Sequence, residues 1–316
     1  IADRQWQVVK EEYFTATGRC AVKTQTGLVL ALKYHLSDNE RLTEQMLRKL
    51  LRDNKNKLNT GFVGTPLLCN VLTEHGMTDL AYRLLLNEEY PGWLHEVKLG
   101  ATTVWERWNS LDENGRISST GMNSLNHYSY GAVLEWIFRH VAGIDVTEQG
   151  PGGKMMRISP KVDHKLGSAS AVYDSASGCY RCGWQIANGD QITVTVTVPF
   201  GAKAQVILPY APDSVYHDTD NPLFETVENG ICCVKAGQYT VTYKAASPLK
   251  KSYSVDSTLE DLLAEPAIRA FLSNMMEVDM IPDLAYGLTL RQAAEAFAGG
   301  VSAEQAQRLN VLLEEF

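Results

Sequence analysis

The chain has 316 residues, of which 45% are hydrophobic and 21% are charged, with 29 Lys and Arg against 37 Asp and Glu. This composition excludes a disordered chain, a collagen-like repeat and a small disulfide-stapled module, and the length suits two domains better than one. No apolar run approaches the roughly 18 residues that cross a bilayer, and a net charge of −8 argues against a nucleic-acid-binding protein. We therefore expect neither a membrane nor a nucleic acid as a partner.

The negative charge is concentrated near the C-terminal end. Residues 252–316 contain three basic and eleven acidic residues, so they carry the whole net charge and the rest of the chain is neutral. A neutral body suits an uncharged substrate. The first residue is Ile1 rather than Met, and from this start we expect the chain to be a fragment of a longer protein.

Residues 1–145 are predicted to form helices joined by short loops. Apolar side chains follow helical spacing over residues 28–36 and 42–51, and Ser37 with Asp38 is the expected cap of the second helix. Apolar helices alternate with amphipathic ones across tight turns. This alternation indicates antiparallel helical hairpins, about three in all.

Proline and glycine mark the boundaries of the later helices. Pro66 follows a breaker at Gly61–Gly64 and is expected to open a helix, which Gly76 ends before Thr78 caps the next one. A last long helix is expected over residues 124–142.

After Gly143 the pattern changes from helical spacing to alternation. Residues 191–199 alternate almost perfectly, and Asn188-Gly189 before them is a strong hairpin signal. Six other segments have the composition of strands: residues 154–159, 168–173, 179–187, 204–208, 231–234 and 239–243. Residues 146–250 are therefore predicted to form an antiparallel β-sandwich.

Residues 251–316 return to a helical pattern and are predicted to form a small acidic helical module. Thr258 is expected to cap one helix, Pro266 to open another, and Thr289 and Ser302 to cap two more. Nothing in this module has the pattern of a reactive site, so packing or docking is its expected role.

Six cysteines are distributed along the chain, at positions 20, 69, 179, 182, 232 and 233. Cys69 lies in an apolar helical pattern, where a buried, unreactive thiol is expected. Cys179 and Cys182 have the spacing of metal ligands, but no second pair stands near them and their segment is strand-like. We therefore expect reduced structural cysteines, no metal site and a cytoplasmic location.

The densest run of unusual residues spans positions 91–110, with three Trp, one His and two Glu. Trp rings stack on the C–H faces of sugars, and a carboxylate held among them can have its pKa raised or its orientation fixed for acid–base chemistry. Trp105 and Trp108 flank Glu106 in this way. The alternative is a helix end or loop packed into the core, with Glu106 paired to Arg107 or to a nearby Lys, and the residues alone leave both interpretations open.

A second cluster, Asn126-His127-Tyr128, follows a polar loop over residues 109–124 that is too long for a mere connector. His127 stands near the expected start of the long helix, where it can face a site above the helix ends. A single His in such a place is more often a structural group than a ligand.

Three motifs together resemble the C-terminal part of bacterial α-L-rhamnosidases. They stand in that family's order and spacing: Gly61-Phe-Val-Gly-Thr-Pro66, Gly100-Ala-Thr-Thr-Val-Trp-Glu-Arg-Trp108 and Asn126-His-Tyr-Ser-Tyr-Gly131. The end of the long helix and residues 168–175 are also similar, so the resemblance extends over residues 10–245.

The resemblance implies a catalytic (α/α)6 toroid of six helical hairpins, of which this chain holds a part, followed by a β-sandwich. It implies cofactor-free hydrolysis of terminal α-L-rhamnosyl groups with inversion, on a rhamnose-containing glycoside or oligosaccharide. Glu106 aligns with the general base, and His127 with a residue that binds the sugar hydroxyls. Asn126 beside it, and Trp105 and Trp108 from their chemistry, complete the expected substrate site.

The family's general acid lies in an acidic motif, upstream of the resemblance, that this chain does not contain. An inverting glycosidase needs both carboxyl groups, about 6.5–9.5 Å apart. Five other carboxyl groups are candidates, and nothing in the sequence favours one: Glu88, Glu89, Glu96, Asp112 and Glu113. We therefore expect the chain alone to be inactive and to need the N-terminal part of the same protein. Apolar faces in residues 1–60 that this part would cover are expected to cause association or disorder.

Alternatives from other classes stay open. A helical-toroid hydrolase for another sugar would share the fold and the base. A non-catalytic carbohydrate-binding or scaffold protein would use the β-sandwich, although residues 154–245 contain a single Trp, Trp184. A protein-interaction role for the acidic tail is the third alternative.

Overall fold

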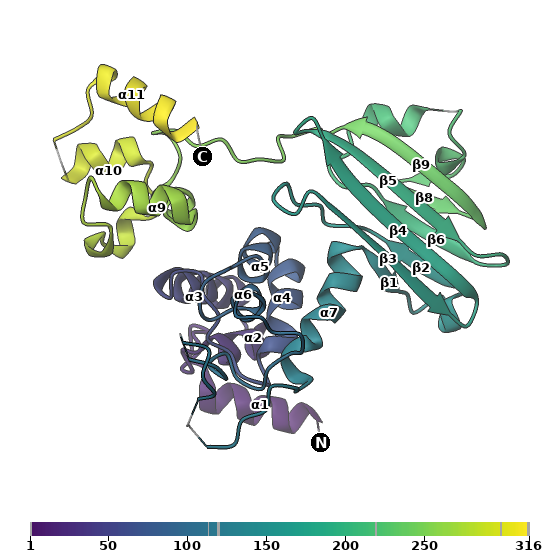
Figure 1. Ribbon diagram of the computed structural model, residues 1–316, viewed down its shortest axis with the longest axis horizontal. Coiled ribbons are helices and arrows are strands. Elements are labelled where there is room, and N and C mark those ends of the chain that lie inside the picture. Colours follow the sequence, from purple (N-terminus) through teal and green to yellow (C-terminus); the bar gives the residue numbers. More distant parts are fainter. Residues whose placement is uncertain (1, 113, 119–120, 219, 298, 315–316) are drawn as a thin grey trace. The chain divides into compact units, whose positions relative to one another are not determined.

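The computed structural model describes residues 2–112, 114–118, 121–218, 220–297 and 299–314. The chain divides into two compact units, Ile1–Leu249 and Lys250–Phe316. The first unit is helical as far as Val141 and rich in strands after it (Figure 1). The predicted order of a helical region followed by a β-rich region is confirmed.

The helical region is built around α4. The helices of this region are α1 (Ala2–Tyr13), α2 (Gln25–Lys33), α3 (Glu40–Asp53), α4 (Thr65–Glu74), α5 (Thr78–Leu85), α6 (Trp93–Lys98) and α7 (Val133–Trp136). The last of them, α7, follows directly on a 3-10 turn at Ser129–Ala132 and leads into a π turn at Ile137–Val141. α4 packs against α2, α5 and α7, and its side chains Leu68, Val71 and Leu72 are fully buried. Pro66 lies in its first turn and Gly76, with φ +73°, directly follows its cap, as the sequence predicts.

Two predicted helix caps are wrong. The cap of α3 is Asn39, and the hydroxyl of Ser37 instead donates to Gly18 O at 2.9 Å. Thr78 is already the first residue of α5, so Met77 occupies the cap position and makes no side-chain cap bond. Both errors are shifts of one or two residues at a helix end, where sequence patterns are least precise.

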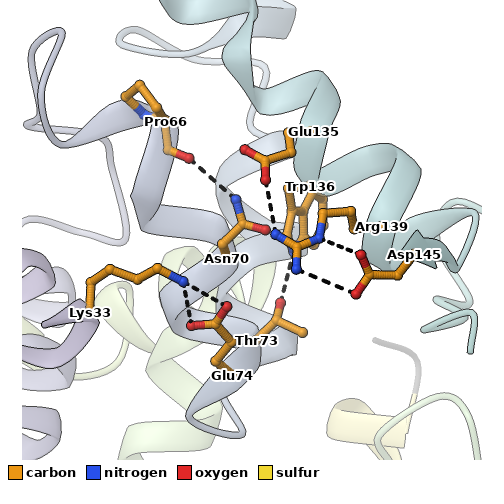
Figure 2. A network of polar contacts seen from close by, with 9 residues as sticks. All are labelled: Lys33, Pro66, Asn70, Thr73, Glu74, Glu135, Trp136, Arg139 and Asp145. Atoms are coloured by element: carbon orange, nitrogen blue, oxygen red, sulfur yellow. Dashed lines mark hydrogen bonds and ion pairs between the residues drawn. The ribbon is translucent and has the colours of Figure 1, made fainter. Parts of the chain in front are cut away.

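A polar network joins α4 to α7 and to the first strand (Figure 2). The indole Nε1 of the fully buried Trp136 donates to Thr73 Oγ1 at 2.8 Å. Arg139 binds both Glu135 and Asp145, at N–O distances of 2.9 Å each. Because Asp145 lies in β1, these contacts fix the end of the helical region to the start of the β-rich region.

The strands form two sheets. The five-stranded sheet has the order β1 (Ile144–Val146), β2 (Met155–Ile158), β6 (Lys203–Ile207), β8 (Ile231–Val234) and β7 (Val227–Glu228); the four-stranded sheet has the order β3 (Ser168–Ser175), β4 (Gly178–Ala187), β5 (Gln191–Val198) and β9 (Gly237–Lys244). All seven predicted strand segments are present, and β5 is buried at alternate positions. The Asn188-Gly189 turn joins β4 to β5 with both residues at positive φ, as a tight hairpin requires.

One strand pair is not antiparallel as predicted. β2 and β6 run parallel, with Met156 beside Ala204, while every other pair of the described strands is antiparallel. β1 and β7 were not predicted, because three and two residues are too few to show an alternating pattern. The fully buried Tyr180 reaches from β4 to the other sheet, where its hydroxyl lies 3.0 Å from Lys203 O.

The helical and β-rich regions of the first unit share one hydrophobic core. The indole of Trp184, on β4, donates to Val141 O at 2.7 Å at the end of the last helical segment. Backbone bonds add to this junction: Lys161 N–H donates to His140 O and Ser159 N–H to Gly143 O, each at 2.8 Å. Trp184, which a carbohydrate-binding sheet would expose, is buried here.

The second unit has its own core and contains α8 (Leu259–Ala264), α9 (Pro266–Ser273), α10 (Leu290–Phe297) and α11 (Ala303–Glu314). All four predicted helix starts are confirmed. Thr289 and Ser302 each form a reciprocal capping box with the Gln three residues later, at distances of 2.9–3.2 Å.

The cysteines are free thiols. Cys69 is buried in α4, and this burial raises its pKa to about 12. Cys179 and Cys182 lie in β4, the strand predicted for them. The described residues contain no group of three or more His, Cys, Asp or Glu side chains placed to hold a metal, and no described helix has the length and apolarity needed to span a membrane.

Candidate functional site

The predicted site residues lie on two loops that are bonded side by side. Residues 101–110, here the base loop, carry Glu106, and residues 123–128, the histidine loop, carry His127. The backbone N–H of His127 donates to Val104 O at 2.8 Å, and that of Glu106 donates to Ser124 O at 2.9 Å. A hydroxyl bond from Thr103 to the histidine loop adds to this pairing. The two loops therefore bring Glu106 and His127 to the same part of the molecule.

This pairing explains why the last helical segment begins at Ser129 and not, as predicted, at Ser124. The backbone groups of residues 124 and 127 are used by the base loop, so they are not available to a helix. The histidine loop is also held at its start, where Asn123 exchanges hydrogen bonds of 2.6 and 2.9 Å with Ser110.

Glu106 is half-buried in the base loop. The loop turns directly after it, with the N–H of Arg107 donating to Ser110 Oγ at 3.1 Å. Backbone bonds on both sides thus fix the chain that carries this carboxylate, while its side chain remains accessible.

Trp105 and Trp108 are the buried residues on either side of Glu106 in the base loop, with 3% and 8% of their surface exposed. The ring of Trp108 stacks on Tyr130 with centroids 4.0 Å apart, and its Nε1 donates to Thr60 O at 3.1 Å. Both indoles are therefore packed in the core, and neither offers an open ring face to a ligand.

Trp108 belongs to a series of ring contacts, here the aromatic ladder, that leads from the core to the surface. Successive members are Trp93, Trp108, Tyr130, Phe62, His127 and Tyr128, with centroid distances of 5.3, 4.0, 5.6, 4.9 and 5.3 Å. The first three are buried, whereas Phe62 and Tyr128 are 45% and 85% exposed. Phe62 was not predicted as a site residue: its segment was interpreted as a helix breaker and as a motif of the family resemblance, and nothing local shows the contact of its ring with His127.

His127 is half-buried, and its neighbour Asn126 is exposed. The N–H of Ser129 donates to His127 Nδ1 at 3.3 Å. Because an acceptor nitrogen of imidazole carries no proton, the neutral ring has its hydrogen on Nε2. His127 is therefore a hydrogen-bond donor toward any ligand that meets its Nε2 edge.

Three of the carboxyl groups considered for the missing acid are occupied elsewhere. Glu88 pairs with Lys98. Glu89 pairs with Lys57 at 2.8 Å, which holds its pKa below the ordinary value and keeps it ionised. Asp112 accepts the backbone N–H groups of residues 114 and 116 at 2.9 and 2.8 Å and shapes its own turn. Glu113 lies outside the described residues.

Glu96, on α6, is the unusual member of this group. Its side chain is almost completely buried, and this burial raises its pKa to about 7, although the nearby backbone N–H of Trp105 acts in the opposite direction. Its Oε1 atom has no hydrogen-bond partner. Glu96 therefore holds a proton near neutral pH, but it faces the core and not an open site.

The buried Glu96 predicts that the stability of the first unit depends on pH. Unfolded Glu loses its proton near its ordinary pKa of 4.5, whereas folded Glu96 keeps it to about 7. Between these values the folded chain binds one more proton, so the free energy of unfolding falls as pH rises, by about 3 kcal/mol from this group. Because all six Trp precede residue 250, urea unfolding followed by Trp fluorescence measures this unit. Glu96→Gln should flatten the slope between pH 4.5 and about pH 7; an unchanged slope would remove Glu96 as its cause.

Comparison with known proteins relates this chain to a family. Residues 2–141 match the bacterial alpha-L-rhamnosidase 6 hairpin glycosidase domain, and residues 143–221 match the bacterial alpha-L-rhamnosidase C-terminal domain. An α-L-rhamnosidase of Alteromonas sp. (strain LOR) is 39% identical over 221 residues, and one of Formosa agariphila is 39% identical over 208 residues. These matches cover 69% and 65% of this chain.

A solved structure agrees with these matches. The α-L-rhamnosidase of Streptomyces avermitilis, in complex with L-rhamnose, superposes on 77% of this chain with a TM-score of 0.69 and 32% identity. The chain spans about a quarter of the length of these relatives: 23% and 22% of the two curated proteins and 24% of the crystallised one. Both matched domains end before the second unit begins.

Proposed function

Since the chain belongs, through residues 2–221, to the bacterial α-L-rhamnosidase family, we propose that it forms the C-terminal part of an enzyme that hydrolyses terminal α-L-rhamnosyl groups. The observation that carries this proposal is the pairing of the base loop with the histidine loop, because it brings the segment of Glu106 beside that of His127, whose Nδ1 accepts the Ser129 N–H. The substrate is a rhamnose-containing glycoside or oligosaccharide.

In the proposed mechanism Glu106 is the general base of an inverting reaction. Its carboxylate takes a proton from a water molecule whose oxygen attacks the anomeric carbon, while the bond from that carbon to the leaving oxygen breaks. The leaving oxygen takes its proton from a general acid on the opposite face of the sugar, about 6.5–9.5 Å from Glu106. In this proposal the general acid comes from the remainder of the enzyme, as the resemblance to the family implies. The four described candidates in this chain suit the role poorly, because they are paired, structural or buried.

In this proposal the remaining site residues bind the sugar or support the base loop. His127 donates from Nε2 to a sugar hydroxyl, and the exposed Asn126 lies where it can add a second polar contact. Trp105 and Trp108 shape the pocket from below by holding the base loop against the core.

The helical region is, in this proposal, half of an (α/α)6 toroid whose other hairpins come from the preceding part of the enzyme, and the two sheets form the β-sandwich that follows it. Support comes from apolar side chains on the outer helices. Trp6, Val8 and Tyr13 of α1, with Tyr34 after α2, are 39–59% exposed. Trp6 and Tyr34 line a shallow depression with Asp3 and Leu36. Such a surface suits cover by further helices.

The proposal is tested on the longer protein with chromogenic α-L-rhamnoside and with matched glycosides of other sugars. We expect hydrolysis of the rhamnoside, and NMR should show the β-anomer of rhamnose as the first product because inversion converts an α-linkage to β. Hydrolysis of another sugar alone would favour the alternative of a helical-toroid glycosidase with a different substrate. Hydrolysis of none would favour a non-catalytic carbohydrate-binding protein.

His127→Ala should mainly weaken sugar binding. Removing the Nε2–H donor costs one hydrogen bond to an uncharged group, about 1–1.5 kcal/mol, which corresponds to a rise in KM of about tenfold. Steady-state kinetics of the longer protein measure this, and Asn114→Ala, in the turn of residues 112–116, is the control. Unchanged KM and kcat would exclude His127 from the site.

A further inference from the structure

His127 is the middle member of three nearly parallel rings. Phe62 stacks on it at 4.9 Å and Tyr128 at 5.3 Å, each with an interplanar angle of 11°. The faces of the His127 ring are used for stacking on aromatic partners, so a polar contact with a ligand falls to its edge. With Nδ1 occupied by the Ser129 N–H, the Nε2–H is the edge group left to act.

Phe62 connects this stack to the rings beneath Glu106. Besides His127 it contacts Tyr130, edge to face, with centroids 5.6 Å apart and an angle of 60°. Tyr130 in turn stacks on Trp108 of the base loop at an angle of 6°. The orientation of His127 is thus tied through two rings to the loop that carries the general base.

The segment that carries Phe62 is itself held firmly. The hydroxyls of Thr60 and Thr65 are 2.8 Å apart, and Thr60 O accepts the indole N–H of Trp108. A Cβ atom on Gly64 would lie 2.4 Å from Thr26 Oγ1, so only glycine lets this segment approach α2 so closely. Phe62 is nevertheless 45% exposed. Its ring is thus carried by a fixed segment and contacts both Tyr130 and His127.

We propose that Phe62 is a positioning residue of the sugar site, which holds the His127 imidazole edge-on, with its proton on Nε2, so that this N–H donates to a hydroxyl of the bound sugar. This inference rests on the proposed role of His127 in binding the substrate. Phe62 acts through His127 and takes no part in proton transfer.

The first test needs no substrate and uses the 316-residue chain. In nitrogen-15 NMR spectra of labelled histidine, His127 should show an unprotonated Nδ1 and a protonated Nε2. Phe62→Ala should give a mixture of the two tautomers, Phe62→Tyr should keep the single form, and Phe138→Ala, which removes another exposed ring outside the ladder, should change nothing. A proton on Nδ1 in the unaltered chain, or no response to Phe62→Ala, would overturn the proposal.

The second test uses the longer protein. Phe62→Ala should raise KM about tenfold, the cost of one misplaced hydrogen bond, while kcat changes little and Phe62→Tyr restores KM. Combined with His127→Ala it should add nothing further, because two residues that act through one contact are not additive. Additive effects, or a loss in kcat with normal KM, would contradict a positioning role. If the longer protein hydrolyses no glycoside, the proposed function fails, and the NMR result still decides whether Phe62 sets the tautomer.

Discussion

Replacing Glu106 by Gln in the longer enzyme is expected to lower kcat by about 10²–10⁴-fold. The amide keeps the size of the side chain but cannot accept a proton from water, and a positioned general base contributes about this factor. The base loop should stay intact, because it is held by backbone bonds from Glu106 and Arg107 and not by the carboxylate. Initial rates on a chromogenic α-L-rhamnoside, with a melting curve for each variant, measure the effect.

Glu89→Gln is the matched control for this variant. It removes one carboxylate in the same region, but that group is paired with Lys57 and lies outside the two loops. Its kcat should stay close to the unaltered value. Near-normal turnover of Glu106→Gln would show that another group activates water and would end the assignment of Glu106 as base.

The largest expected loss of stability follows from removing Trp136. Its ring is fully buried, meets Tyr82 edge to face at 5.2 Å and donates its only N–H to Thr73. Substitution by Ala leaves a cavity and an unpaired hydroxyl, which together should lower the free energy of unfolding by about 3–5 kcal/mol. Urea unfolding followed by circular dichroism gives this value without relying on the deleted fluorophore.

Leu134→Ala is the control for Trp136→Ala, because Leu134 lies in the same helix but is 56% exposed. It should cost well under about 1 kcal/mol, as is usual for surface positions. Equal losses for the two variants would mean that Trp136 does not hold α7 against α4 as described.

Local sequence patterns predicted most of the helices and strands. They succeeded where the structure that the local pattern favours is also the one that packs in the fold. The alternation of residues 191–198 gives a strand buried on one face, and Thr289 and Ser302 cap helices with the Gln residues that follow them. The parallel pairing of β2 with β6 was not predictable, because register and direction depend on contacts between segments about 50 residues apart.

Candidate site residues could be chosen from the sequence, but their arrangement could not be predicted. The base loop and histidine loop were recognised by their unusual side chains, yet residues 124–127 were predicted to be helical because nothing local shows that their backbone bonds to residues 104 and 106. The sequence did not distinguish Glu96 from the other candidate carboxyl groups; the structure does, because Glu96 is buried. The stacking of Phe62 on His127 joins residues 65 positions apart and has no local signature.

Hydrolysis of a chromogenic α-L-rhamnoside, measured in parallel on this 316-residue chain and on the complete open reading frame, tests the central claim most directly. The account predicts turnover by the longer protein and none by the chain, because we propose that the chain supplies the base and a sugar-binding residue while the rest of the enzyme supplies the acid. Turnover by the chain alone would contradict this division and direct the search for the acid to Glu96, Asp112 and Glu113. Turnover by neither would contradict the assignment of the rhamnoside as substrate.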